Sequence, residues 1–338
     1  SATTEYSCTV KNNISTVNVN ATATSSKSKV RGLGTKDLTV GKNTLPIRVI
    51  AEDGSEKIYN VNVTRKGGVT SLKNEIMKNT VVTANPTLTT SSNNTSDASG
   101  LYKSTATNTG NPTYYFRGNV NNNYVSFAGQ TWRIVRVNED GTIRIVMQDG
   151  INSNANIAFN SNYNNYTYMY YTNSEAKTTL ESWYQTNIGS KADLSKNVAS
   201  GAYYCEQAKA KVSSSYTSGN ANMTLYSSYT PDFKCSSDGN GKGVVSTSVG
   251  LLTYDEVVYA GGYYAQNNSN YYLNNPAIYW WTMSPAGFSG SSSNVWNVYT
   301  TGNMNGNYVH YARRLRPVLI LNADTLVTGD GTSSDPFV

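Results

Sequence analysis

The chain has 338 residues, and only 14% of them are charged, against about a quarter in an average soluble protein. Its 27 basic and 21 acidic side chains give a net charge of +6 and are spread along the sequence, so we expect no nucleic-acid partner. No run approaches the roughly 18 apolar residues of a membrane span. A surface of uncharged polar side chains is typical of secreted and cell-wall proteins, and we expect an extracellular protein.

Tyrosine dominates the aromatic residues, with 27 Tyr against 6 Phe and a single His. A phenol hydroxyl needs a partner when it is buried, so interiors are usually built from Phe, Leu and Ile. Tyr beside Asn, Ser and Gly gives rigid contact area with adaptable hydrogen bonding. The composition therefore indicates a contact surface, concentrated between residues 279 and 316, and a binding protein instead of an enzyme.

Residues 6–65 contain several short runs in which apolar and polar side chains alternate. Turn signals such as Gly32-Leu33-Gly34 and Glu52-Asp53-Gly54 separate these runs. Short alternating strands at this spacing predict an antiparallel β-sandwich.

The order of motifs in this segment is Tyr6-x-Cys8-x-Val10, Gly41-x-Asn43, Ile47-x-Val49-x-Ala51 and Tyr59-x-Val61-x-Val63-x-Arg65. It resembles a cadherin-like β-sandwich repeat of bacterial surface proteins. The resemblance implies a spacer over residues 1–66, without catalytic residues. Members of that family begin with a strand before the position of Tyr6, so the resemblance also implies an incomplete sandwich edge. Such an edge could be left bare by truncation, filled by upstream sequence, or paired with a neighbouring molecule.

Residues 67–99 are expected to join this sandwich to a second domain. Gly67-Gly68 ends the sandwich, and residues 69–78 read as a short helix with Leu72, Ile76 and Met77 on one face. Residues 80–99 are almost wholly Thr, Ser, Asn and Ala, which predicts a flexible tether.

Residues 100–338 mix many short strands with two helices, which predicts an α+β domain. Residues 132–137 and 143–147 form a predicted hairpin around the turn at residues 138–141. One helix is expected to begin at Ser174 as N-cap, and Thr253 with Glu256 predicts a capping box for another. Later strands are expected near residues 279–283, 295–299 and 316–321.

The motifs of this half include Tyr115-Phe116-Arg117-Gly118, Trp132-Arg133-Ile134-Val135, Trp281-Thr282-x-Ser284-Pro285 and Arg316-Pro317-Val318-Leu319. They resemble an uncharacterised domain on surface proteins of gut Gram-positive bacteria. The final strands and Gly302 are similar to C-type-lectin-like domains of bacterial adhesins. The resemblances imply a mainly β protein in which a sandwich spacer precedes a C-type-lectin-like α+β binding domain.

The three cysteines are Cys8, Cys205 and Cys235. All three could be buried thiols, but an oxidising compartment favours a Cys205–Cys235 disulfide with Cys8 left over. The family resemblance implies the same pair. Their spacing fits no zinc site, and no metal or other cofactor is expected.

Catalysis is not expected from the titratable residues. His310 has no partner carboxylate or nucleophile by motif, so it is interpreted as one polar residue of a surface loop. Asp255 and Glu256 are adjacent on a helix and point to different sides, and the capping box already accounts for Glu256.

The sequence predicts a cell-surface adhesin that binds a glycan or a host or matrix protein. The alternative is a structural subunit of an extracellular filament or surface layer, which would self-associate by strand complementation at the open sandwich edge. Val295, Val298 and Val309 are expected to point inwards, and of the adjacent Trp280 and Trp281 one should face inwards and one outwards. The residues expected to contact the ligand are Trp281, Phe288, Asn294, Trp296, Asn297, Tyr299, Asn303, Asn305, Asn307, Tyr308, His310 and Tyr311.

Overall fold

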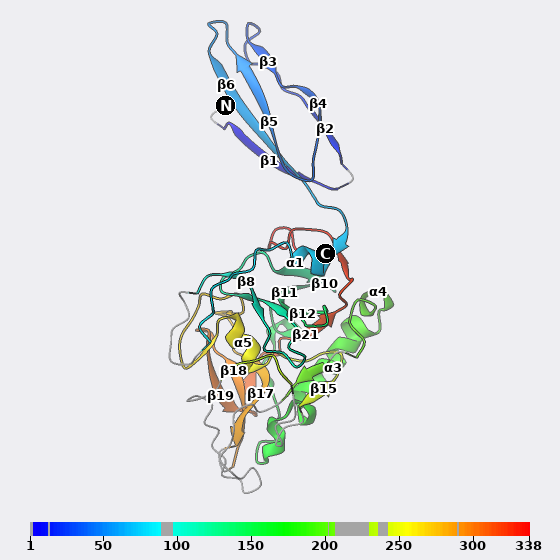
Figure 1. Ribbon diagram of the computed structural model, residues 1–338, viewed down its shortest axis with the longest axis vertical. Coiled ribbons are helices and arrows are strands. Elements are labelled where there is room, and N and C mark those ends of the chain that lie inside the picture. The colour runs from blue at the N-terminus through cyan, green and yellow to red at the C-terminus, as the bar shows by residue number, and fades with distance from the viewer. Residues whose placement is uncertain are drawn as a thin grey trace. The chain divides into compact units, whose positions relative to one another are not determined.

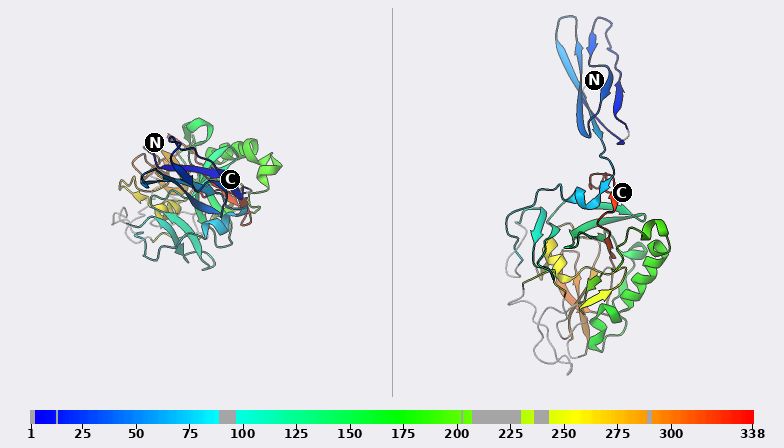
Figure 2. Two further views of the ribbon diagram at one scale, coloured as in Figure 1. Left: turned by 90° about the horizontal axis from the view of Figure 1, so that it is seen from above. Right: turned by 45° about the vertical axis from the view of Figure 1, so that its right-hand side comes forward.

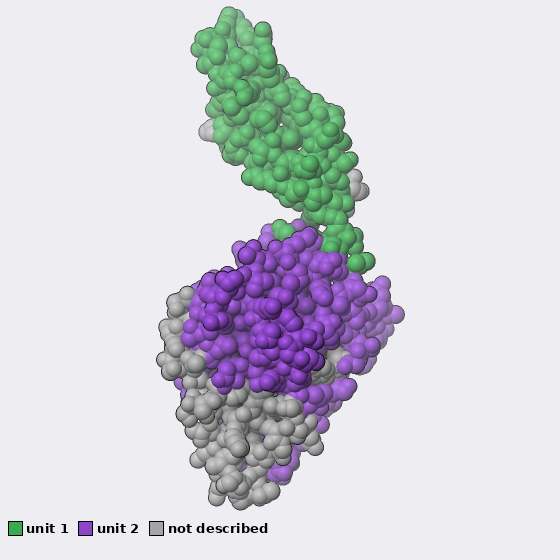
Figure 3. Space-filling view, in the orientation of Figure 1, with its two compact units in different colours: residues 1–70, 326–330 green, residues 71–325, 331–338 purple. Residues whose placement is uncertain are grey.

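The computed structural model describes residues 3–12, 14–88, 97–201, 203–206, 230–235, 243–288 and 291–338. The chain divides into two compact units (Figure 3). Unit 1 contains residues 1–70 and 326–330, and unit 2 contains residues 71–325 and 331–338. Within the described ranges, no helix is long and apolar enough to cross a membrane.

Unit 1 contains the expected β-sandwich. Its larger sheet has the strand order β1 (Glu5–Val10), β6 (Glu56–Arg65), β5 (Gly41–Ile50) and β3 (Lys29–Arg31) (Figure 1). The long β5–β6 pair is antiparallel from Gly41↔Arg65 to Ile50↔Glu56. The predicted antiparallel arrangement is wrong for β1, which runs parallel to β6. Two further strands, β2 (Thr16–Val19) and β4 (Gly34–Asp37), form the second sheet.

The core of unit 1 is small, and one side of it is open. Val19, Ile47 and Val63 are buried as their alternation predicts, whereas Tyr6 is 45% exposed. A cavity of about 420 Å³ lies against Tyr6, Ile47 and Tyr59 and is bounded by residues 20–24. In the described part of unit 1, β2 is paired only with β4. An additional strand at an edge of this sandwich therefore stays a prediction.

In the segment expected to be a linker and tether, the described residues 71–88 and 97–99 belong to unit 2. The helix α1 (Leu72–Ile76) begins at Ser71, whose hydroxyl accepts from Asn74 N, and both Leu72 and Ile76 are buried. The described residues 80–88 continue this packing, because Val82 N donates to Leu101 O over 2.8 Å. Asp97 accepts from the backbone N–H and hydroxyl of Thr87. The apolar positions of the helix, together with these polar contacts, explain why the segment folds with unit 2 instead of hanging free.

Unit 2 is built around a main sheet with the order β21-β12-β11-β9-β8, to which β10 adds at β11. The predicted hairpin of β11 and β12 is present, and β21 pairs antiparallel with β12 from Ile143↔Leu321 to Val146↔Val318. Every side chain of β12 and β21 is buried, because both faces of the sheet are covered at these two strands. The strand bounds are β8 Gly100–Ser104, β9 Thr113–Arg117, β10 Tyr124–Phe127, β11 Gln130–Val137, β12 Ile143–Met147 and β21 Val318–Leu321.

A second sheet in unit 2 has the order β16-β19-β18-β17. Strands β17 (Trp280–Phe288), β18 (Ser293–Val298) and β19 (Asn303–Tyr308) are antiparallel, and β16 (Tyr263–Tyr264) is parallel to β19. Both predicted helix starts are confirmed: Ser174 caps α3 (Glu175–Tyr184), and Thr253 with Glu256 forms the capping box of α5 (Tyr254–Ala260).

Short elements connect these parts, and α3 with α4 lies along one side of unit 2 (Figures 1 and 2). Their bounds are β7 Thr70–Ser71, α2 Ile151–Asn154, β13 Ile157–Ala158, η2 Tyr166–Met169, η3 Tyr171–Asn173, η4 Gln185–Gly189, α4 Ala192–Ser195, β14 Tyr203–Cys205, β15 Val244–Ser246, β20 Ala312–Arg313 and β22 Leu326–Val327.

Many tyrosines of unit 2 are core residues, which contradicts the expectation that the tyrosine-rich composition describes a surface. Their hydroxyls donate to backbone carbonyls, as Tyr204 does to Val318 O (2.8 Å) and Tyr271 to Gly302 O (2.9 Å). Burial raises the pKa of both phenols, and it raises the pKa of Tyr263 to about 12. These hydrogen bonds satisfy the polar end of the Tyr204 and Tyr271 rings, which lowers the free-energy cost of burying them.

The tryptophans confirm one prediction and contradict another. Trp132 is fully buried, as expected for a core residue. Trp280 and Trp281 are both buried, although strand alternation predicts one outward side chain. The Trp281 indole donates to Ile157 O (3.2 Å), while the Arg316 guanidinium covers Trp280 at 4.7 Å. Both faces of β17 are therefore covered at this point.

The predicted disulfide joins Cys205 to Cys235, with Cα atoms 5.6 Å apart, and Cys8 is exposed and free. Because the bond closes a loop of 30 residues, replacing both cysteines by Ser should lower the free energy of unfolding of unit 2 by roughly 3 kcal/mol. Chemical denaturation followed by tryptophan fluorescence measures this loss, and Cys8→Ser is the control that should show none. Intact mass should rise by two hydrogens on reduction, and an unchanged mass would contradict the bond.

Candidate functional site

Four of the predicted ligand-binding residues are buried, and the prediction is wrong for them. Trp281 and Asn297 are 0% exposed, Trp296 is 3% and Phe288 is 7% exposed. Trp296 packs against Tyr254, with ring centroids 4.8 Å apart, and Trp281 against Phe159 at 5.9 Å. These side chains are buried inside unit 2, where a ligand cannot reach them.

The other eight predicted residues lie at least partly on the surface. The three exposed residues are Asn305, Tyr308 and Tyr311. The half-buried ones are Asn294, Tyr299, Asn303, Asn307 and His310. Val295, Val298 and Val309 are all fully buried, which confirms the predicted inward positions. The valines of this stretch therefore anchor it, and these eight polar and aromatic residues lie at least partly at the surface.

The exposed aromatic residues gather around His310. Its ring lies 4.4 Å from that of Tyr163, 4.8 Å from that of Tyr311 and 5.8 Å from that of Tyr308, centroid to centroid. The His310 and Tyr308 rings are nearly parallel, at 12°. Tyr308 also meets Tyr311 edge to face at 5.6 Å.

Arg313 extends this cluster to two more tyrosines. Its guanidinium carbon lies 5.8 Å from the Tyr311 ring centroid and 5.2 Å from that of Tyr279. Tyr279 in turn meets Tyr299 edge to face at 5.1 Å, and the Asn307 amide donates to the Tyr299 hydroxyl over 3.4 Å. We call the resulting continuous set of side chains the aromatic surface; it consists of Tyr163, Tyr279, Tyr299, Tyr308, His310, Tyr311 and Arg313.

Backbone hydrogen bonds between distant segments place these residues side by side. Val309 N donates to Ser293 O (3.1 Å), and Ser293 N donates to Tyr163 O (2.8 Å), which brings residue 163 beside the end of β19. Arg313 lies on β20, which pairs with β13, and Arg314 N donates to Tyr279 O (2.8 Å). A turn closed by Tyr311 N and Tyr308 O (3.0 Å) leaves the side chains on either side of Val309 facing outwards.

The aromatic surface contains every exposed tyrosine in the described part of unit 2. Among the tyrosines whose side chains the structure describes, the exposed ones are Tyr6 in unit 1 and Tyr163 (43%), Tyr279 (40%), Tyr308 (38%) and Tyr311 (42%) in unit 2. The last four all belong to the aromatic surface. Among the tyrosines of unit 2 whose side chains the structure describes, the exposed ones are thus confined to one site, whereas the buried ones are spread through the core.

Tyr279 and Arg313 lie inside the predicted contact stretch of residues 279–316 but are not among the expected contact residues, and Tyr163 lies outside that stretch. Residues 160–168 and residues 303–311 are both rich in Asn and Tyr. That likeness in composition was a signal that both segments belong to one surface. Nothing in the spacing of the sequence indicated that β13 and β20 pair and so bring Arg313 to it.

Glu256 belongs to a separate, enclosed ion cluster. Its Oε1 lies 2.8 Å from Arg144 Nε and 3.2 Å from Arg136 Nε, and its Oε2 accepts from Thr253 N over 3.0 Å. Burial raises the pKa of the Glu256 carboxyl, but the two guanidiniums and the Thr253 N–H outweigh burial, so the pKa lies below its ordinary value of 4.5. The carboxylate is held ionised at the start of α5, and its contacts are those of a structural group.

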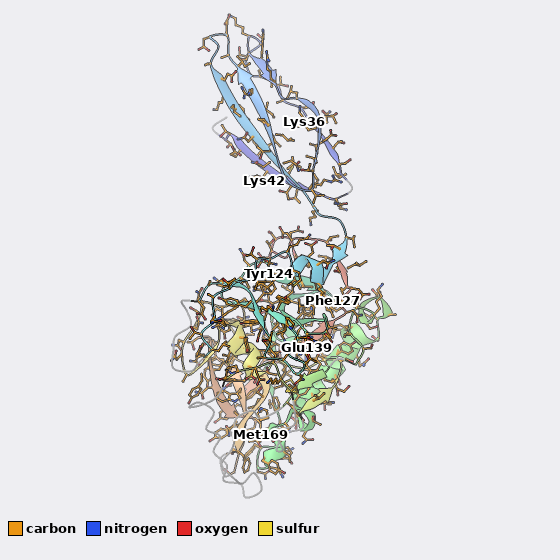
Figure 4. All side chains as sticks on the ribbon, in the orientation of Figure 1. Lys36, Lys42, Tyr124, Phe127, Glu139 and Met169 are labelled. Atoms are coloured by element: carbon orange, nitrogen blue, oxygen red, sulfur yellow. A yellow bond between two sulfur atoms is a disulfide. The ribbon has the colours of Figure 1, made fainter. Side chains whose placement is uncertain are left out.

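A polar cavity of about 310 Å³ lies beside this cluster and is lined by Arg136, Glu139, Arg144 and neighbouring polar residues. Figure 4 labels Glu139, which lies in the turn between β11 and β12. In the described part of the chain, no three or more His, Cys, Asp or Glu side chains form a group that could hold a metal ion.

Comparison with known families covers both units. Residues 1–66 match the cadherin-like β-sandwich domain. Residues 144–323, more than half of the chain, match a domain of unknown function, DUF6273. The chain belongs to the DUF6273 family. The matched DUF6273 segment contains every residue of the aromatic surface, from Tyr163 to Arg313. No curated protein and no solved structure matches this chain.

Proposed function

We propose that the chain is an extracellular binding module from the surface of a Gram-positive bacterium, and that unit 2 binds a saccharide on the aromatic surface. The observation that carries this proposal is the gathering of four exposed tyrosines with His310 and Arg313 at one site. The cadherin-like unit 1 would act as a spacer. Unit 2 would serve the role that C-type-lectin-like domains serve in adhesins.

The chemistry of the surface suits a saccharide. Flat aromatic rings give apolar area for the C–H faces of sugar rings, and phenol and amide groups beside them can hydrogen-bond to sugar hydroxyls. Asn305 is exposed in the middle of β19, and Asn303 at its start donates to Asn267 Oδ1 over 2.7 Å. An enzyme is not proposed, because His310 is surrounded by tyrosine rings and Glu256 is engaged by two arginines.

Replacing Tyr308 and Tyr311 together by Ala should weaken saccharide binding by about 2 kcal/mol or more, roughly thirtyfold, because truncating aromatic anchors at the centre of a binding surface has effects of this size. A glycan array that also carries host matrix proteins would identify the ligand, and titration calorimetry would measure the loss. Tyr6→Ala is the matched control, since Tyr6 is 45% exposed but lies in unit 1. Equal affinity of the double variant and the control would refute the proposed site, and binding to matrix proteins alone would refute a saccharide ligand.

A further inference from the structure

Arg313 is the basic member of the aromatic surface, and its hydrogen-bonding capacity is largely unused. Its Nη1 donates to Ala312 O over 2.9 Å. Its Nε is shielded from solvent and has no hydrogen-bond partner in the described part of the chain. A guanidinium has five N–H donors, so most of them are free for a ligand.

In the part of the chain that the structure describes, no carboxylate is paired with Arg313. Among the described residues it forms no ion pair, whereas Arg117 pairs with Asp97, and Arg136 and Arg144 pair with Glu256. The other members of the aromatic surface are tyrosines and one histidine. The site therefore carries positive charge without an acidic side chain among its members, and this polarity favours an anionic ligand.

The two tyrosine rings also hold the guanidinium in place. Arg313 lies between Tyr279 and Tyr311, with its guanidinium carbon within 6 Å of both ring centroids, the range in which a cation is attracted by a ring face. A stacked guanidinium keeps the N–H edge of its plane available, and two parallel N–H groups match the two oxygens of a carboxylate or sulfate.

We propose that the aromatic surface recognises an acidic saccharide, whose sugar rings stack on the tyrosines while Arg313 binds a carboxylate or sulfate group. This inference rests on the proposed function, and it adds the charge class of the ligand. It assigns Arg313 as the residue that distinguishes acidic from neutral saccharides.

The test measures binding of the whole chain to three polysaccharides by titration calorimetry: hyaluronan for carboxylate, dextran sulfate for sulfate, and dextran as the neutral reference. The variants are Arg313→Gln, which removes the charge, and Arg313→Lys, which keeps the charge without the planar fork. Lys191→Gln is the control, because it removes one exposed positive charge next to α4, well away from β19 in Figures 1 and 2. Thermal unfolding confirms that each variant is folded.

We expect hyaluronan, dextran sulfate or both to bind more tightly than dextran, and Arg313→Gln to weaken that binding roughly tenfold or more, since hydrogen bonds to charged groups have effects of this size. Arg313→Lys should fall between the wild type and the Gln variant, and Lys191→Gln should bind as the wild type does. Equal losses in Arg313→Gln and Lys191→Gln would show general attraction of a polyanion and overturn the inference. If neutral saccharides bind as tightly as acidic ones and binding still depends on Tyr308 and Tyr311, the inference fails while the proposed function stands.

Discussion

Replacing Glu256 by Gln should lower the free energy of unfolding of unit 2 by about 3–5 kcal/mol, because it leaves two enclosed guanidiniums without their counter-charge. Arg144 is 3% and Arg136 12% exposed in their side chains, so bulk water is a poor substitute for the carboxylate. Gln has nearly the shape of Glu, so the loss of stability is caused by the missing charge and not by a new cavity. The total free energy of unfolding of an ordinary domain is about 5–15 kcal/mol, and the variant should therefore be close to unfolding.

Chemical denaturation followed by tryptophan fluorescence isolates this effect, since all five tryptophans, Trp132 to Trp296, lie in unit 2. Asp193→Asn on α4 is the matched control, because it makes the same carboxylate-to-amide change at an exposed position and should alter stability by less than about 0.5 kcal/mol. A loss for Glu256→Gln as small as that of Asp193→Asn would contradict the structural role of the ion cluster.

The same carboxylate gives a pH dependence of known sign. The folded-state pKa of Glu256 is depressed below 4.5, so its stabilising contribution is fully present above that value and is lost as the pH falls through the folded-state pKa. The wild type should therefore lose more stability than Glu256→Gln between neutral pH and acid conditions. The difference in unfolding free energy between the two should shrink as the solution is acidified.

Replacing Gly302 by Ala should destabilise unit 2 by about 3 kcal/mol or more, an effect of backbone strain and steric overlap together. Gly302 has φ +77° in the turn between β18 and β19, and a Cβ atom there would lie 1.8 Å from Asn268 O and 3.0 Å from the Tyr271 ring. The obstructing atom is backbone, and Gly302 O itself accepts from the Tyr271 hydroxyl over 2.9 Å. The segment holding Asn268 would have to move.

Gly129→Ala is the control that separates the effect of backbone strain from the effect of steric overlap. Gly129 has φ +71°, and a Cβ atom there would meet nothing within 4 Å. Replacing Gly129 by Ala should lower the free energy of unfolding by only about 1–2 kcal/mol, the penalty for a left-handed backbone at a residue with a side chain. Equal losses of unfolding free energy at the two positions would show that the contact with residue 268 has no effect of its own.

Local patterns in the sequence predicted the framework of the fold. The capping box at Thr253 and Glu256, the N-cap at Ser174 and the hairpin of β11 and β12 each depend on residues close together in the chain, and all are present. The inward positions of Val295, Val298 and Val309 follow from their apolar side chains in an otherwise polar stretch. These features need no knowledge of which distant segments meet.

The errors concern contacts between segments far apart in the sequence. Trp280 and Trp281 are both buried because elements from elsewhere in unit 2 cover both faces of β17. The sequence indicates Arg117 only as part of the motif at residues 115–118. In the structure its buried guanidinium donates to Asp97 and to the carbonyls of Val258 and Tyr259. Alternation indicates which side chains share a face, and it cannot indicate whether a face is covered.

The burial pattern around Val309 has a consequence for how this domain can change. Val309 is fully buried, while Tyr308 and Tyr311 on either side of it project outwards and His310 is half-buried. Folding free energy at this turn therefore depends on the valine and on backbone hydrogen bonds, and much less on the identity of its neighbours. One scaffold can then present many different recognition chemistries at these positions, which makes residues 308, 310 and 311 suitable sites for a library that retargets the domain to new ligands.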